Sequence, residues 1–258
     1  MMVAIVSDIH ANIEALTTVM KDIDQQGIDE VVCLGDVVGY GPDPIPCVEI
    51  AQKFFRWTLM GNHDQALFNG ATGFNPRAKG AIATHLELLK PAWYSKRDKK
   101  EHWNFLKRMP LRYMEEGYLF VHAAPQNPTE EYLLPSDVDA VLGDFSPKLK
   151  RAFEEVTSAC FVGHTHHPGI FVESKKKFIA QRELGDERYR LDPDDRYIIN
   201  VGSVGQPRDG DTRAGYCIVE DGQVLLKRIA YDFQATKKKI HEHPRLDNEL
   251  GDRLEKGV

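Results

Sequence analysis

The chain has 258 residues, 42% of them hydrophobic, which is enough for one large domain with a substantial core. Its formal net charge of −6 at pH 7 disfavours a general nucleic-acid-coating role, because such binding depends on clustered Lys and Arg. The apolar stretch near the start, Val3–Val6, is too short for a signal sequence or a membrane span. The cysteines lack metal-knuckle spacing and fit buried thiols in a reducing compartment, so the sequence predicts a soluble cytoplasmic protein.

Short β-branched runs alternate along the chain with longer amphipathic stretches, as they do where strands are joined by crossover helices. In chain order, we expect strands at residues 3–7, 30–34, 57–60, 117–122, 159–162 and 197–201. Between them we expect helices at residues 12–26, 44–54, 76–89, 98–108 and 147–156. Asn75-Pro76 and Ser146-Pro147 each place a capping side chain before a proline at the first helical position, which supports two of these helix starts.

In the C-terminal third of the chain, the spacing of the apolar residues changes. Residues 215–220 and 223–230 flank Asp221-Gly222, a two-residue hairpin signal that predicts an antiparallel region. The charged segment 173–196 contains turn residues and is typical of a solvated hairpin or lid.

These features predict a single domain over residues 1–233, followed by a charged tail at 234–258 that is at most partly helical. The apolar residues of that tail are too widely spaced to predict one packed helix: Ile240, Leu246, Leu250 and Leu254.

Side chains that can bind a metal follow five of the expected strands. They are Asp8 and His10, then Asp36, then Asn62 with His63 beside it, then His122, and finally His164 and His166. Loops at the carboxyl ends of strands are where open α/β sheets build their sites. Two carboxylates, one amide and four imidazoles, with no thiolate, suit two borderline divalent cations better than Ca²⁺ or a structural zinc.

Each of these residues alone has an ordinary structural interpretation. An Asp at a strand end is usually a turn or cap residue, and a histidine after an apolar strand, such as His122, is more often a core residue. Their coincidence at five successive strand ends favours a shared site. The same reasoning leaves the remaining histidines as packing or surface residues: His85, His102, His167, His241 and His243.

A family resemblance rests on these motifs in their order. Asp8-x-His10, Gly35-Asp36-x-x-Gly39, Gly61-Asn62-His63-Asp64, His122 and Gly163-His164-x-His166 resemble the motifs of the calcineurin-like metallophosphoesterases. The block from Asn200 to Asp209 is similar to a compact bacterial and archaeal subgroup, described as diadenosine-tetraphosphatase-like or as phosphodiesterases. The resemblance implies an α/β fold in which two mixed β-sheets form a sandwich flanked by helices.

The resemblance also implies roles for individual residues. Asp8, His10 and His166 would hold a first metal ion, Asn62, His122 and His164 a second, and Asp36 would bridge them. The implied cofactor is a pair of divalent ions, in the first place Mn²⁺, with Fe, Zn, Co or Ni as alternatives. His63 would lie over the phosphate and either stabilise the transition state or protonate the leaving oxygen. Asn12 and Arg208 are candidate substrate contacts.

The implied reaction is hydrolysis of a phosphodiester or nucleotide-type phosphoester by a water shared between the metals. Two alternatives stay open at this point: a non-catalytic metal-binding scaffold of the same fold, and a DNA nuclease. The absence of a basic stripe argues against nucleic acid as a partner and favours a small phosphoester or nucleotide substrate. The sequence leaves the leaving group, the metal used and the oligomeric state undetermined.

Overall fold

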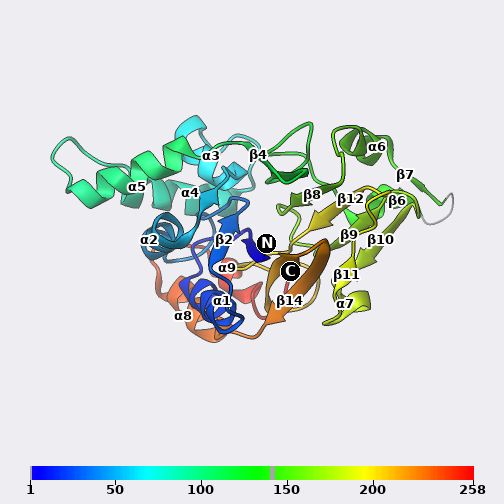
Figure 1. Cartoon of the computed structure of the whole chain (residues 1–258). Coiled ribbons are helices and arrows are strands. Elements are labelled where there is room, and N and C mark those ends of the chain that lie inside the picture. The colour runs from blue at the N-terminus through cyan, green and yellow to red at the C-terminus, as the bar shows by residue number, and fades with distance from the viewer. Residues whose placement is uncertain (1, 140–142) are drawn as a thin grey trace.

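Two six-stranded mixed sheets pack face to face in the computed structural model, which describes residues 2–139 and 143–258 (Figure 1). In order across the first sheet, its strands are β11 (Tyr189–Arg190), β14 (Gln223–Ile229), β13 (Ala214–Glu220), β1 (Met2–Val6), β2 (Glu30–Cys33) and β3 (Trp57–Thr58). The second sheet has β10 (Lys177–Ala180), β9 (Gly169–Val172), β12 (Tyr197–Asn200), β8 (Ala159–Val162), β5 (Tyr118–Val121) and β4 (Arg112–Glu115). A short pair, β6 (Val138–Asp139) and β7 (Asp144–Phe145), stands apart. The expected fold class is confirmed.

Each sheet contains three neighbouring strands that run parallel. β1, β2 and β3 run parallel to one another in the first sheet, and β12, β8 and β5 do so in the second. The hairpin strands β13 and β14, which the sequence predicted, extend the first sheet: β13 pairs antiparallel with β1, and β14 pairs antiparallel with β13. Because parallel strands end at one edge, the polar residues that follow them are brought together.

Alternation along the strands divides the core into layers. Val3 and Ile5 of β1 face the second sheet and pack in one cluster with Phe161. Ala4 and Val6 of the same strand point the other way, into the cluster that holds α1 and α2. Both faces of the strand are therefore apolar, as expected for a strand buried on both sides.

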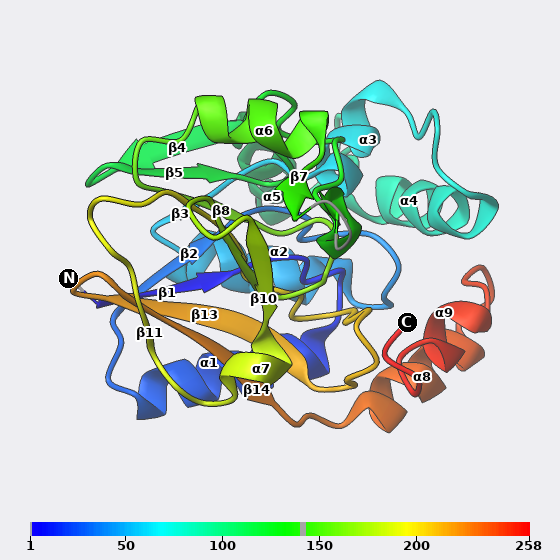
Figure 2. The ribbon, with the colours of Figure 1, turned by 90° about the vertical axis from the view of Figure 1, so that its right-hand side faces the viewer.

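Helices cover the outer faces of the sandwich. Figures 1 and 2 show α1, α2 and α8 on the side of the first sheet and α6 outside the second. The helices are α1 (Ile13–Gln25), α2 (Pro44–Phe54), α3 (Asn62–Asn69), α4 (Pro76–Leu89), α5 (Arg97–Arg108), α6 (Pro147–Glu154), α7 (Gln181–Leu184), α8 (Phe233–Glu242) and α9 (Glu249–Asp252), with a 3₁₀ turn at Pro135–Asp137. Each of these helices is too short or too polar to cross a membrane in the described part of the chain. The cytoplasmic location stays a prediction.

Three segments add detail that the sequence did not give. The residues after β3 form a helix, α3, where the sequence had predicted none. Within segment 173–196, β10 forms a hairpin with β9, and β11 then joins the first sheet beside β14. In the C-terminal tail, α8 and α9 pack against the body of the molecule, with Leu250 and Leu254 buried.

Candidate metal centre

Seven side chains with metal-binding atoms converge where the parallel strands of both sheets end. They are Asp8 and His10 after β1, Asp36 after β2, Asn62 at the start of α3, His122 after β5, and His164 and His166 after β8. Asp8, His10 and His166 form one cluster whose ligand atoms lie within 4.8 Å of one another. Asp36, His122 and His164 form a second cluster by the same measure. The amide oxygen of Asn62 lies 3.2 Å from Nε2 of His122 and so belongs with the second.

Asp36 belongs to the second cluster and also faces the first. Its Oδ2 is 3.7 Å from Nε2 of His10 in the first cluster and 3.4 Å from Nε2 of His122 in the second. Its other oxygen, Oδ1, accepts the main-chain N–H of His63 at 2.8 Å, at the start of α3. This bond fixes the carboxylate, so that one oxygen faces both clusters.

Main-chain carbonyls orient the imidazoles from behind. Nδ1 of His10 lies 3.1 Å from the carbonyl of Val38, and Nδ1 of His122 lies 3.2 Å from that of Leu34. A carbonyl can only accept, so Nδ1 carries the proton in each neutral ring and Nε2 presents a lone pair to the centre. His166 is held in the same way by the carbonyl of Gln206.

The donor set fits a cation at its centre. Nε2 of His166 lies 2.9 Å from Oδ1 of Asp8 and 3.2 Å from Nε2 of His10. Burial lowers the pKa of both histidines, so lone pairs face one another and the carboxylate across these short gaps. A divalent cation between these three atoms would turn that repulsion into coordination.

The pKa values of the buried groups also indicate that the centre favours positive charge. Burial raises the pKa of Asp8, but His166 and His122 outweigh burial and hold that pKa below its ordinary value. Burial lowers the pKa of His122, but Asp36 and Asp8 outweigh it and raise the pKa to about 9. The centre therefore attracts positive charge strongly, and metal ions would compete with a proton for it.

His63 lies beside the clusters. Its ring centroid is 4.8 Å from that of His10 and 4.4 Å from that of Tyr40. Its Nδ1 is buried without a hydrogen-bond partner among the described residues. Burial lowers the pKa of His63 to about 4, with Asp36 opposing and Arg208 adding to the effect, so the neutral ring prevails at pH 7. A neutral imidazole can donate a hydrogen bond through its N–H, but it has no additional proton to give to a leaving oxygen. Gly39 leaves room for this ring, because a Cβ there would stand 2.2 Å from Nδ1.

The backbone at the centre is left-handed at most of the donors, since φ is +54° at Asp8, +48° at His10, +55° at Asp36, and +60° at both His164 and His166. Non-glycine residues adopt this region at a cost of about 1–3 kcal/mol each unless the surroundings enforce it. Hydrogen bonds enforce this conformation in the turn after β2. The carboxylate of Asp64 accepts the main-chain N–H groups of Asp36 and Val38 in that turn, and also that of Gly61.

Comparison with known proteins identifies the family. Residues 1–222 match the calcineurin-like phosphoesterase superfamily domain. The chain belongs to this superfamily. The family consists of phosphoesterases, which are hydrolases, and it depends on metal ions.

Several proteins match this member of the calcineurin-like phosphoesterase family over almost its whole length. An uncharacterised protein of Methanocaldococcus jannaschii is 38% identical over 262 residues, which cover 98% of this chain and 97% of that protein. The crystal structure of a metallophosphoesterase from Sphaerobacter thermophilus is 34% identical with a TM-score of 0.81, covering 100% of this chain and 99% of the other. A hypothetical protein from Pyrococcus horikoshii OT3 shares the fold at 17% identity, with a TM-score of 0.72 and coverage of 100% and 98%.

Asn12 and Arg208, the two candidate substrate contacts, differ in their surroundings. The amide of Asn12 is buried and used within the protein: it caps α1 at Ala15 and also bonds to Gly205, Tyr231 and Thr236. These bonds give Asn12 a structural role, and its contact with substrate stays a prediction. Arg208 is half-buried, with its Cζ 5.6 Å from the centroid of the Tyr40 ring, and Tyr40 in turn lies against His63.

Other neighbours of the phosphoesterase centre were not assigned from the sequence. An open cleft of about 570 Å³ leads to it and is lined by α3, by the loop that follows α3, and by Tyr132. The Tyr132 ring centroid is 4.0 Å from that of His164. His85 of α4 is buried, accepts the N–H of Gly39 and donates to the carbonyl of Gly41, so it holds the loop that carries Tyr40.

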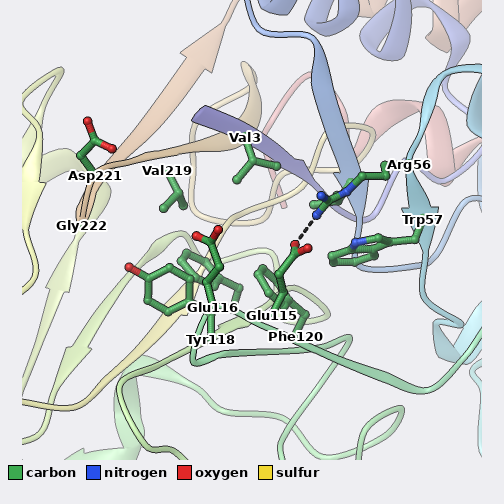
Figure 3. Close-up of a pocket in the computed structure, with 12 residues that line it drawn as sticks. Val3, Arg56, Trp57, Glu115, Glu116, Tyr118, Phe120, Val219, Asp221 and Gly222 are labelled. Atoms are coloured by element: carbon green, nitrogen blue, oxygen red, sulfur yellow. Dashed lines mark hydrogen bonds and ion pairs between the residues drawn. The ribbon is translucent and has the colours of Figure 1, made fainter. Parts of the chain in front are cut away.

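A smaller cavity of about 110 Å³ lies between the sheets at the opposite end (Figure 3). Val3, at the start of β1, and Trp57, at the start of β3, line it, whereas the centre lies beyond the ends of these strands. Beside it, Arg56 forms an ion pair with Glu115 and so connects the two sheets. Its lining contains no histidine, and the groups of side chains that could hold a metal among the described residues are those of the centre.

Proposed function

We propose that this chain hydrolyses phosphodiesters or nucleotide-type phosphoesters, using two divalent cations held by Asp8, His10, Asp36, Asn62, His122, His164 and His166. The observation that carries the proposal is the position of Asp36, whose Oδ2 faces His10 on one side and His122 on the other. A carboxylate in this place can bridge two cations and limit their mutual repulsion. When bound, the cations would supply Lewis-acid charge and a water of lowered pKa.

The protein's own residues would perform the remaining tasks. The carbonyls behind His10, His122 and His166 would keep the ring nitrogens directed at the cations. His63 would donate a hydrogen bond to a phosphoryl or leaving oxygen, which its neutral form supports. The open cleft beside Tyr132 supports a substrate with a second substituent on phosphorus.

The test is hydrolysis of bis(p-nitrophenyl) phosphate with Mn²⁺, Fe²⁺, Co²⁺, Ni²⁺ or Zn²⁺, compared with chelator-treated protein. We expect turnover that depends on added metal, and about two ions per chain by metal analysis. Asp36→Asn should lose activity and most of the bound metal, because a neutral amide is a poor bridge between cations. Asp24→Asn, at an exposed site of α1, is the matched control.

Each other outcome points to an alternative. Tight metal binding without turnover on any phosphoester would favour a non-catalytic scaffold. Preferential cleavage of double-stranded DNA would favour a nuclease. Activity on monoesters alone would contradict the inference from the open cleft, and an Asp36→Asn variant that still holds two ions tightly would contradict the bridging role.

A further inference from the structure

The cleft that leads to the proposed active site has few charged groups. Its volume is about 570 Å³, and His63 and His164 of the centre are among the residues that line it. The described residues of this lining include no lysine or arginine, and Glu130 supplies their one carboxylate. Arg208 contacts the Tyr40 ring but does not line the cleft. A second phosphate placed in the cleft, away from the metal ions, would lack a cationic partner, so the cleft suits an uncharged part of the substrate.

Tyr132 gives this cleft an aromatic wall beside the metal centre. Its ring centroid lies 4.0 Å from that of His164, so the tyrosine packs against a proposed metal ligand. The loop around it is held in place, because the carbonyl of Glu130 lies 3.3 Å from Nε2 of His164 and the carbonyl of Tyr132 accepts a hydrogen bond from Nζ of Lys148. Even so, 45% of the surface of Tyr132 is exposed. A planar aromatic surface is therefore open to a substrate next to the centre.

Amide side chains line the same cleft. They come from Gln65 and Asn69 of α3 and from Asn75, the residue that caps α4. The oxygen of Gln65 lies 3.5 Å from the hydroxyl of Thr129, whereas its amide nitrogen and the whole amide of Asn69 have no hydrogen-bond partner among the described residues. An amide offers a donor and an acceptor in one plane, which matches the mixed donor and acceptor edge of a nucleobase. An acyl chain would leave these groups unused.

We propose that the cleft is a nucleoside subsite, in which Tyr132 stacks on the base of a nucleoside esterified to the reacting phosphorus. The inference rests on the proposed function and narrows its substrates to nucleoside phosphodiesters. The absence of cationic side chains from the described lining disfavours a chain of phosphates, and the amides disfavour a lipid. The exposed ring supplies the surface on which single bases stack in other proteins. Because every base has a planar face, the stacking itself accepts purines and pyrimidines.

The experiment compares two diesters that share a leaving group, thymidine 5′-(p-nitrophenyl phosphate) and methyl p-nitrophenyl phosphate, at one fixed free Mn²⁺ concentration. The wild type should have the lower KM for the thymidine ester. Tyr132→Leu keeps apolar bulk against His164 but loses the planar face. It should raise KM for the thymidine ester at least about fivefold more than KM for the methyl ester. Tyr132→Phe, which keeps the ring, should retain the wild-type ratio of the two KM values.

Tyr94→Leu is the matched control, because Tyr94 is a tyrosine with 75% of its surface exposed that does not line the cleft. It should leave both KM values as in wild type. A wild type without preference for the thymidine ester would overturn the subsite. Equal effects of Tyr132→Leu on the two esters would also overturn it, and would leave Tyr132 as a support of His164, which metal analysis of the variant would register. Failure of the wild type to hydrolyse either ester would instead count against the proposed function, so the two failures can be told apart.

Discussion

The ring nitrogens of the centre take their direction from backbone carbonyls that belong to other loops. Val38 and Leu34 lie in the turn after β2, yet they hold His10 and His122, which follow β1 and β5. A shift of that single turn would therefore rotate one imidazole in each of the two clusters. The carboxylate of Asp64 keeps this turn in place by accepting the main-chain N–H groups of Asp36 and Val38.

His63 offers a way to separate metal binding from chemistry. We expect His63→Ala to retain the metal ions and the fold while kcat falls by roughly 10²–10⁴, the usual contribution of one positioned acid or charge-stabilising group. Metal analysis and steady-state kinetics on the same preparation test this. His243→Ala, in the tail, serves as the control. A His63 variant that loses its metal would show that His63 is itself a ligand, which its place near His10 and Asp36 would allow.

His85 links pH to stability. Burial lowers its pKa to about 4, against 6.5 for an unfolded histidine, so the unfolded chain takes up this proton first as the pH falls. Its contribution to stability is present above pH 6.5 and is lost progressively between pH 6.5 and pH 4, by roughly 1–2 kcal/mol on going from pH 7 to pH 5. Chelator-treated His85→Gln, which keeps a donor and an acceptor, should show a shallower fall over this window in urea titrations. Parallel curves would contradict the buried neutral state.

At the scale of elements, the strands and most helices were predictable because their signals are local. Short β-branched runs marked most of the long strands, and Asn75 and Ser146 cap α4 and α6 as expected. Helix α3 was not predicted, because Asn62 taken alone is typical of a turn. In the structure Asn62 and Asp64 form its first turn, where Asp64 accepts the N–H of Gly61.

The candidate site was predictable to a different degree. Its donors appear in ordered motifs, so their identity and their convergence could be inferred from strand ends alone. Their supporting partners could not be, because Asn12 and His85 act through contacts with residues far away in the sequence. Asn12, for example, bonds to Gly205 and Thr236, and no spacing rule connects these positions.

The tail is an element whose role depends on tertiary contacts. Leu250 is buried against Tyr40 and α4, although its apolar neighbours in the sequence are sparse. We expect Leu250→Ala to cost about 2–4 kcal/mol locally, as for other large-to-small core changes. Hydrogen exchange should then quicken in α8, α9 and the loop 39–43, while β8 and β12 stay protected. Lys256→Ala, at an exposed position, is the control, and uniform acceleration across both sheets would argue against local docking.

At the scale of the whole molecule, the two sheets share their inner core. Ile5 and Val32 of the first sheet pack in one cluster with Phe161 and Ile199 of the second. We expect residues 1–233 to unfold as one unit, with equal calorimetric and van't Hoff enthalpies in chelator-treated protein. Added Mn²⁺ should raise the melting temperature, because metal binds the native state alone. Two separate transitions would contradict the single-domain prediction.

The backbone is left-handed at five of the donors, where folding and function favour different residues. These donors are Asp8, His10, Asp36, His164 and His166. Glycine would relieve this conformation at each of them, so the residue that the fold prefers is the one that cannot bind a metal. In a library sorted only for thermal resistance without metal, glycine should therefore accumulate at these sites. In a library sorted for catalytic turnover, the same sites should stay fixed. Comparing the two enriched populations would show which positions natural selection holds for chemistry at the expense of the backbone.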